Sequence, residues 1–246
     1  MKMLKAARSR GFTLIELAVV LFVVTLILGS ILVPLTSQVE QRQISDTRRT
    51  LEDIKEALMG YAVANGHLPC PAISATNGLE NRTGTTCTAN WRDGYIPWAT
   101  LGVSKLDAWG NIFRYSVTPA YASSLTPTFT FSTPRDITIQ TRDGGAAIIN
   151  LTNVPPNGVP AVVQSYGKNG YRSVNDQGTA QALPTGWPAS NIDEETNATT
   201  GLGTTFVSRV PQAAGVSSNP GEFDDIVVWI SPNILFNRMV AAGKLP

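Results

Sequence analysis

One acidic side chain, Glu16, interrupts an otherwise apolar run. Between Phe12 and Val33 it is the only ionisable residue. A charged residue in a bilayer core costs roughly 2.5–3.5 kcal/mol on insertion scales, so a carboxylate there requires a partner. If the chain is cut after Gly11, the new amine of Phe12 lies four residues away, or about 6 Å along a helix. The spacing therefore predicts a pair between acid and amine, within one chain or between neighbouring chains.

Two other interpretations of this segment stay open. A lone Glu16 near the helix start would lie in the headgroup region, at lower cost and without a partner. An ordinary secretory signal peptide would also begin with basic residues, here Lys2, Lys5, Arg8 and Arg10. The apolar run exceeds the usual length of about 7–15 residues, and no A-x-A cleavage site follows it. Both features disfavour a secretory signal peptide.

The chain has two cysteines, Cys70 and Cys87. Disulfides persist in oxidising compartments, so a domain on the outer side of the membrane predicts that the two cysteines pair. Two free thiols in a cytosolic domain are the alternative. A zinc site is not expected, because His67 is the only histidine and the sequence has no C-x-x-C motif.

Asp224 and Asp225 follow a long segment, residues 171–222, that is rich in polar residues, Gly and Pro. We interpret this segment as a surface excursion. Calcium binds carboxylate and amide oxygens, so Asp224 and Asp225 are candidate calcium ligands. Their spacing matches no D-x-D-x-D-G ligand loop, and a solvated loop without an ion is the favoured alternative. No other cofactor is expected.

Catalytic motifs are missing from the sequence. It has no P-loop, no G-x-S-x-G and no H-E-x-x-H, and its single histidine excludes most histidine relays. Asp224 and Asp225 are adjacent, so on a strand their side chains would point to opposite faces.

Four of the 19 Lys and Arg residues precede Gly11, which leaves 15 basic against 18 acidic residues. We therefore expect neither an enzyme nor a nucleic-acid-binding protein.

A single helix over residues 12–66 is expected to position Glu16. Its apolar part, residues 12–33, is long enough for a bilayer core of about 30 Å. The following part is polar but carries an apolar stripe at helical spacing, with Leu51, Ile54 and Leu58. Asn65 and Gly66 predict the helix end. We expect one helix, half in the membrane and half packed on a domain; the alternative is an anchor followed by a separate soluble helix.

Residues 67–246 are predicted to form one β-rich domain. Alternating apolar residues and turn signals predict strands at 112–117, 129–131, 137–141, 146–151, 159–166 and 226–230, with a hairpin turn at 142–145. These strands suffice for one antiparallel sheet against the helix. Ser231, followed by Pro232 and with Gly243 beyond the end, predicts a short C-terminal helix. The fold class is α+β with loop insertions.

Residues 11–16, GFTLIE, follow a short basic leader. This segment resembles the cleavage and methylation motif of type IV pilins and type II secretion pseudopilins. Residues 107–111, 166–170 and 224–229 are similar to later segments of the same family. The resemblance implies a leader of residues 1–11 that a prepilin peptidase removes after Gly11. It also implies N-methylation of Phe12, an assembly role for Glu16 and a pilin-like fold.

The resemblance further implies a structural subunit, either a pseudopilin or a minor pilin. Such a subunit assembles through its N-terminal helix into a type IV pilus or a secretion pseudopilus. The implied partners are the prepilin peptidase, other pilin or pseudopilin subunits, the inner-membrane assembly platform and the lipid bilayer. The implied location is the bacterial inner membrane, in a single pass, with the domain in the periplasm.

Three questions about function stay open. A minor or tip subunit would use its enlarged domain to bind a surface or cargo. A membrane-anchored binding or adhesion protein would never polymerise. Some major pseudopilins bind calcium near the region that corresponds to Asp224, which adds to the calcium hypothesis.

Overall fold

The structure is a computed structural model. It describes residues 11–88, 92–125, 129–142, 147–181, 191–198, 203–212 and 221–245, with the side chains of residues 28–35 excepted. The predicted basic leader and the central residues of the predicted turn at 142–145 lie outside the described residues. The chain separates into two compact units, residues 1–43 and 44–246, and each is considered by itself.

Helix α1, Leu14–Asn65, has 52 residues and is continuous, as predicted. It ends where the sequence places its stop, because Gly66 adopts a φ of 82°. This left-handed conformation is one that glycine adopts without steric cost. The Gly66 N–H still donates to the carbonyl of Ala62 at 2.7 Å, which closes the last turn.

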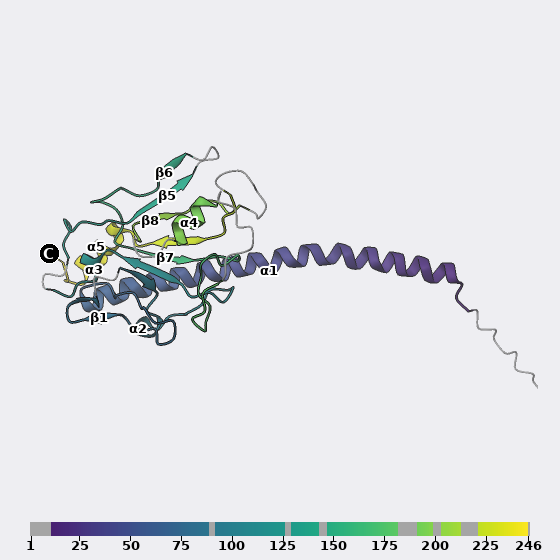
Figure 1. The fold of residues 1–246 in the computed structure, drawn as a ribbon, viewed down its shortest axis with the longest axis horizontal. Coiled ribbons are helices and arrows are strands. Elements are labelled where there is room, and N and C mark those ends of the chain that lie inside the picture. Colours follow the sequence, from purple (N-terminus) through teal and green to yellow (C-terminus); the bar gives the residue numbers. More distant parts are fainter. Residues whose placement is uncertain are drawn as a thin grey trace, which may run out of the picture. The chain divides into compact units, whose positions relative to one another are not determined.

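The remaining elements belong to the second unit (Figure 1). The strands are β1 (Arg82–Thr83), β2 (Thr86–Cys87), β3 (Asp93–Tyr95), β4 (Arg114–Val117), β5 (Thr138–Arg142), β6 (Ile148–Asn150), β7 (Ala161–Ser165), β8 (Thr205–Val207) and β9 (Ile226–Trp229). The helices are α2 (Trp98–Leu101), α3 (Pro119–Ala122), α4 (Ile192–Ala198) and α5 (Pro232–Ala241). The predicted C-terminal helix is therefore confirmed.

The main sheet is antiparallel, in the order β3-β4-β7-β9. Tyr115 of β4 pairs with Val163 of β7, which pairs in turn with Val228 of β9. Leu51, Ile54 and Leu58 of α1 are fully buried in the same core as Tyr115 and Val163. The predicted apolar stripe of the helix therefore packs on the domain.

The prediction of one antiparallel sheet is wrong. A second sheet has the order β6-β5-β8, and its β5 and β8 pair in parallel. Both strands of that parallel pair contribute to a second apolar core, which contains Ile139 and Phe206 together with Val162 and Val227 of the main sheet. In Figure 1 this second sheet lies on the side of the domain away from α1.

The predicted strand at 129–131 is also wrong. Phe129 is buried, and its ring lies 4.5 Å from that of Tyr121. The chain then turns, with the Thr133 N–H donating to the carbonyl of Thr130. Aromatic packing, not a strand ladder, accounts for the alternating pattern here.

The described residues of the segment 171–222 are only partly the solvated excursion that its composition predicts. The segment contains α4 and β8, and Glu194 and Asn197 on α4 are buried. Asp193 is also buried and forms ion pairs with Arg142 and Arg209. Polar side chains can enter the interior here because partners from other segments satisfy their charges and hydrogen bonds.

Candidate functional site

Thr13 and Glu16 form a reciprocal cap at the start of α1. The Glu16 carboxylate accepts the backbone N–H and the hydroxyl of Thr13, each at 2.9 Å, and the Glu16 N–H donates to the Thr13 hydroxyl at 3.2 Å. This geometry is a capping box, which satisfies two otherwise unpaired N–H groups of a first turn. The sequence predicts a partner for Glu16; in the uncut chain that partner is Thr13.

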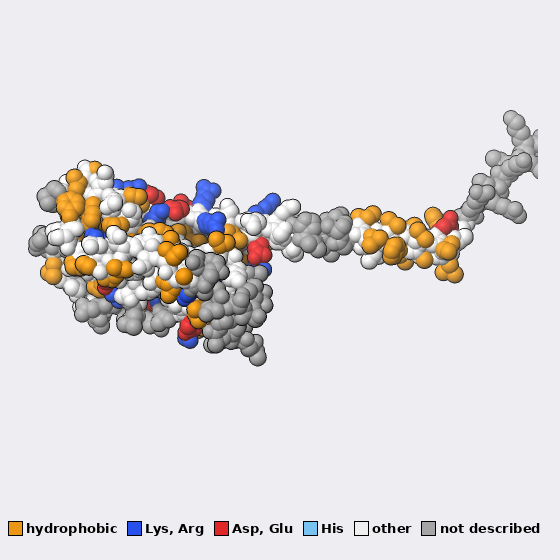
Figure 2. Space-filling view, turned by 90° about the horizontal axis from the view of Figure 1, so that it is seen from above, with side chains coloured by type: hydrophobic (Ala, Val, Ile, Leu, Met, Phe, Trp, Pro, Cys, Tyr) orange, Lys and Arg blue, Asp and Glu red, His pale blue; other side chains and the backbone are white. Residues whose placement is uncertain are grey.

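The first turns of α1 expose their apolar side chains. Phe12, Leu14 and Ile15 are the most exposed of them, and the exposure continues to Ile27. Figure 2 shows hydrophobic side chains over the visible side of this stretch. In the part of the chain that the structure describes, no helix has an apolar stretch long enough to cross a membrane.

The loop before β4 is built around Asp107. One oxygen of its carboxylate accepts the N–H groups of Trp109 and Asn111 at 3.0 and 2.9 Å, and the other accepts the Ser165 hydroxyl at 2.6 Å. Desolvation raises the pKa of Asp107. The Ala108 N–H donates to the Thr47 hydroxyl of α1, so this loop fastens the helix to the domain.

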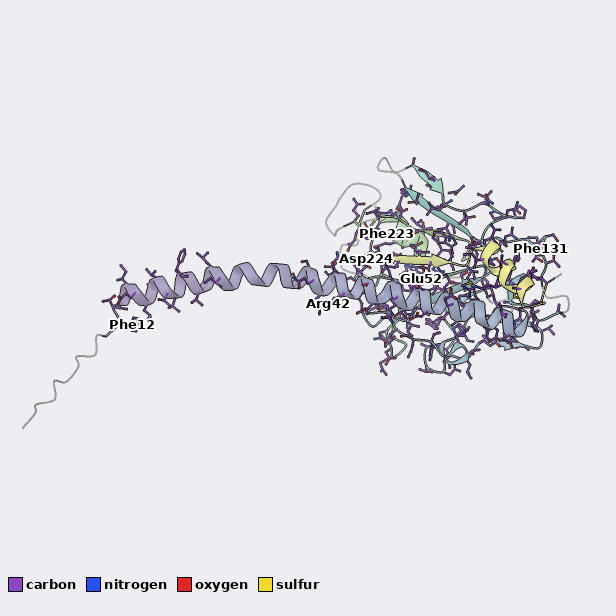
Figure 3. The ribbon with its side chains drawn as sticks, turned by 180° about the vertical axis from the view of Figure 1, so that it is seen from behind. Phe12, Arg42, Glu52, Phe131, Phe223 and Asp224 are labelled. Carbon is purple, nitrogen blue, oxygen red and sulfur yellow. A yellow bond between two sulfur atoms is a disulfide. The ribbon has the colours of Figure 1, made fainter. Side chains whose placement is uncertain are left out.

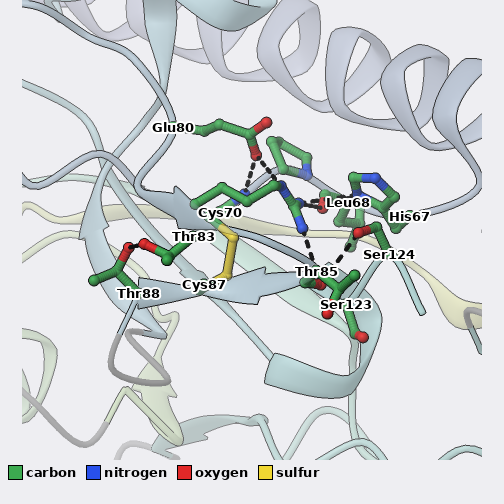
Figure 4. The surroundings of a disulfide bond; sticks show 12 residues. His67, Leu68, Cys70, Glu80, Thr83, Thr85, Cys87, Thr88, Ser123 and Ser124 are labelled. Atoms are coloured by element: carbon green, nitrogen blue, oxygen red, sulfur yellow. Dashed lines mark hydrogen bonds and ion pairs between the residues drawn. A yellow bond between two sulfur atoms is a disulfide. The ribbon is translucent and has the colours of Figure 1, made fainter.

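Cys70 and Cys87 form a disulfide, so the predicted pairing is confirmed (Figure 4). Their Cα atoms are 5.4 Å apart, and the bond closes a loop with a sequence separation of 17. Glu80 lies inside this loop, where its carboxylate accepts the Cys70 N–H at 3.0 Å and pairs with Arg82 at 3.1 Å. Covalent and polar contacts thus order the start of the domain.

Asp224 and Asp225 precede β9, and Figure 3 shows the position of Asp224. One oxygen of Asp224 accepts the Asn169 N–H at 2.8 Å. One oxygen of Asp225 accepts the side-chain amides of Gln164 and Asn197 at 3.1 and 2.8 Å. The second oxygen of each carboxylate is buried without a hydrogen-bond partner among the described residues. The two side chains use different donors, as expected for adjacent residues of an extended chain.

No sequence pattern singled out Glu194, which is 1% exposed. Its carboxylate accepts the Asp224 N–H at 3.1 Å and the side-chain amide of Asn169 at 3.0 and 3.1 Å. Desolvation and the nearby charge of Asp224 raise the pKa of Glu194 to about 8. The pattern Asn191-x-x-Glu194 before a short helix is a capping-box signal, but it gives no sign that Glu194 is buried.

These acids do not assemble a metal centre in the described residues. No group of three or more His, Cys, Asp or Glu side chains there is placed to hold an ion. Burial raises the pKa of Asp224 to about 6 and that of Asp225 well above its usual range. The donor chemistry suits calcium, but only two of the expected ligands are near each other in sequence, and their contacts diverge. Calcium binding stays a prediction.

Comparisons with known proteins cover the N-terminal half of the chain. Residues 6–32 match the prokaryotic N-terminal methylation motif, and residues 34–132 match the family of protein G of the type II secretion system. The type II secretion system core protein G of Pseudomonas aeruginosa is 28% identical over 109 residues, which are 44% of this chain and 73% of that protein. No solved structure matches.

A helix packed on an antiparallel sheet, preceded by a processing motif, defines the pilin-like class of α+β proteins. The matches to both parts of this arrangement show that the chain is similar to type IV pilins and type II secretion pseudopilins. The matches reach residue 132. The second sheet and α4 lie beyond that residue.

Proposed function

We propose that this protein is a pseudopilin subunit that assembles through its N-terminal helix into the pseudopilus of a type II secretion system. The observation that carries the proposal is the apolar, exposed start of α1 with the single acid Glu16 at its first turn. Such a surface needs cover from lipid or from other helices. The match to secretion protein G favours the pseudopilus over the type IV pilus.

Assembly would begin with cleavage after Gly11 by a prepilin peptidase and methylation of the new amine on Phe12. The subunit would wait in the inner membrane in a single pass, with its domain in the periplasm. The assembly platform would then bring helices together, so that their apolar surfaces leave the lipid. An unpaired ion inside the bundle is costly, so pairing Glu16 of one subunit with the Phe12 amine of its neighbour would enforce the register.

A Glu16→Ala variant tests this proposal. Filament assembly in the native host should be lost, while the domain keeps its thermal unfolding transition. If the protein were a membrane-anchored binding protein that never polymerises, Glu16→Ala would leave its function unchanged. Intact mass of the wild-type protein provides the second measurement: residues 1–11 should be missing and one methyl group added. A full-length mass would contradict the proposed processing.

A minor or tip subunit is the second candidate function. It is favoured by the second sheet and α4, which lie beyond the family match at residue 132. A bulk subunit should occur along the whole filament, whereas a tip subunit should occur once per filament. Counting labelled copies along isolated filaments distinguishes the two.

Calcium binding is a separate proposal, supported by the buried, unpartnered oxygens of Asp224 and Asp225. A bound cation would replace the proton that burial favours on these acids. Calcium should then raise the melting temperature, and a chelator should lower it. An Asp225→Asn variant should lose that response. A melting temperature that neither calcium nor chelator changes would contradict calcium binding.

A further inference from the structure

Among the described residues, the main sheet ends at β3 and β9, and the second sheet ends at β6 and β8. Of these edge strands, β9 pairs with β7 and β6 pairs with β5. The Ile230 N–H donates to the carbonyl of Ala161, beside the β7 to β9 ladder. Hydrogen-bonded pairs alternate along an antiparallel ladder. The backbone groups of Val227 and Trp229 therefore point away from β7, toward the open edge.

The open edge of β9 lies in a groove of about 360 Å³. Met59 of α1, Val228 and Trp229 of β9, and Ile234 of α5 line it. Ile234 is 51% exposed. A groove between a sheet edge and a helix is an arrangement that accepts an extended segment as an added strand, with alternate side chains entering the pocket.

The groove carries little unpaired charge. Its charged lining residues, Glu52 and Lys55, form an ion pair with each other. Next to it, Arg238 of α5 pairs with Glu56 at 2.6 Å. Figure 3 shows Glu52 on α1, close to the strand that follows Asp224. The occupant of such a groove should be apolar and uncharged.

Strand β6 has these properties. Ile148 and Ile149 are on opposite faces of the strand, yet they are 56% and 48% exposed. No charged residue occurs between residues 147 and 157. The Leu151 N–H donates to the carbonyl of Ile139, so the backbone groups of Ile148 and Asn150 point away from β5. Exposed edge strands are normally protected by charge, proline or a bulge, and β6 has none of these within its bounds.

We propose that β6 of one copy adds to the open edge of β9 in a second copy and places an aliphatic side chain in its groove. The same chain supplies an uncharged apolar strand and a neutral apolar groove that accepts one. Each copy would use its β6 and its β9 edge in different contacts. Such a heterologous contact propagates into a filament when the rotation between copies does not close a ring, whereas β6 pairing with β6 would stop at a dimer. The proposal rests on the proposed function, because it assigns a contact between assembled subunits.

Cross-linking of the full-length protein in assembled filaments tests this contact. Both native cysteines are in the disulfide, so introduced thiols are the reactive ones. With a short bismaleimide, a mixture of Asn150→Cys and Ser231→Cys subunits should give dimers, and the double variant should give a ladder. Neither single variant alone should cross-link. Dimers from Asn150→Cys alone would overturn the proposal in favour of β6 self-pairing, and no cross-link in any sample would overturn it outright.

Two variants test the contact by disruption. Ile148→Pro removes an outward N–H, and Ile234→Lys places a charge in the groove; each should lower the cross-link yield at least tenfold. Ile148→Lys replaces Ile148→Pro if that variant does not fold. Leu79→Lys is the matched control, because Leu79 is also 56% exposed. Thermal melting checks that each domain is folded.

The outcomes separate this contact from the proposed function. If Glu16→Ala abolishes assembly while Ile234→Lys leaves the cross-links unchanged, the strand contact fails and the pseudopilin function stands. If Glu16→Ala leaves assembly intact, the proposed function fails. Cross-links between β6 and β9 in that case would still report strand pairing.

Discussion

Thr13 and Glu16 form reciprocal hydrogen bonds at the first turn of α1. The carboxylate of Glu16 accepts two hydrogen bonds from Thr13, and the Thr13 hydroxyl accepts the N–H of Glu16. The acid therefore has a local structural role before any cleavage occurs. Loss of assembly in Glu16→Ala would consequently have two explanations, a lost charge and a lost cap.

The variant Glu16→Gln separates these explanations. Glutamine serves as the acceptor of a capping box but carries no charge. If Glu16 pairs with the Phe12 amine, Glu16→Gln should lose filament assembly as completely as Glu16→Ala. Assembly can be measured by electron microscopy of sheared filaments. Normal filaments from Glu16→Gln would contradict the charge-pair mechanism and support the cap.

The disulfide should stabilise the domain considerably. Cross-linking a loop of this length lowers the conformational entropy of the unfolded chain. In the loop-closure model this stabilises the folded state by about 3 kcal/mol. A Cys70→Ser, Cys87→Ser double variant should therefore lose about 2–4 kcal/mol in the free energy of unfolding, measured by urea titration. Wild type unfolded with a reductant present should show the same loss. A midpoint that is insensitive to both changes would contradict this estimate.

Asp93 and Arg114 form a buried two-pronged ion pair, with both hydrogen bonds at 2.7 Å. Asp93→Asn should destabilise the domain by about 3–5 kcal/mol, because it removes the hydrogen-bonded counter-charge of a buried guanidinium. Glu56→Gln is the matched control, since Glu56 pairs with Arg238 at the surface. That change should cost at most about 1 kcal/mol. Equal losses in the two variants would show that burial of the ion pair does not determine the loss in the free energy of unfolding.

His67, the only histidine, should make the domain acid-sensitive. Desolvation and the nearby Arg82 guanidinium lower the pKa of His67 below its usual 6.5. Just below pH 6.5, His67 therefore binds a proton more readily in the unfolded chain than in the folded chain. Stability should therefore fall as the pH drops through 6.5 toward the lower folded-state value.

A His67→Gln variant isolates this effect, because glutamine does not titrate. Urea midpoints measured from pH 5.5 to 7.5 should vary less with pH in the variant than in the wild type. Buried acids such as Glu194, whose pKa is raised to about 8, act in the opposite direction. The comparison between variant and wild type removes their contribution. Identical pH slopes would show that His67 titrates normally in the folded chain.

Local patterns predicted much of this fold. The helix from residue 14 to Gly66, the strands β5, β6, β7 and β9 and the C-terminal helix all follow from periodicity and turn residues. The disulfide between Cys70 and Cys87 followed from residue identity and compartment. Short two- and three-residue strands such as β1 and β3 were missed, because such segments are too brief to show a period.

The sequence by itself determined the processing motif, the continuous helix and its buried stripe, because these depend on neighbours within a turn or two of chain. Only the tertiary structure decided that Glu194 and Asn197 are buried and that β5 pairs in parallel with β8. Those outcomes depend on partners far along the chain: the Asn169 side-chain amide donates to Glu194, and the Asp225 carboxylate accepts from the Asn197 side-chain amide. A buried polar segment and a solvated loop can have the same composition. Whether such a segment is buried depends on whether distant residues supply hydrogen-bond partners for its polar groups.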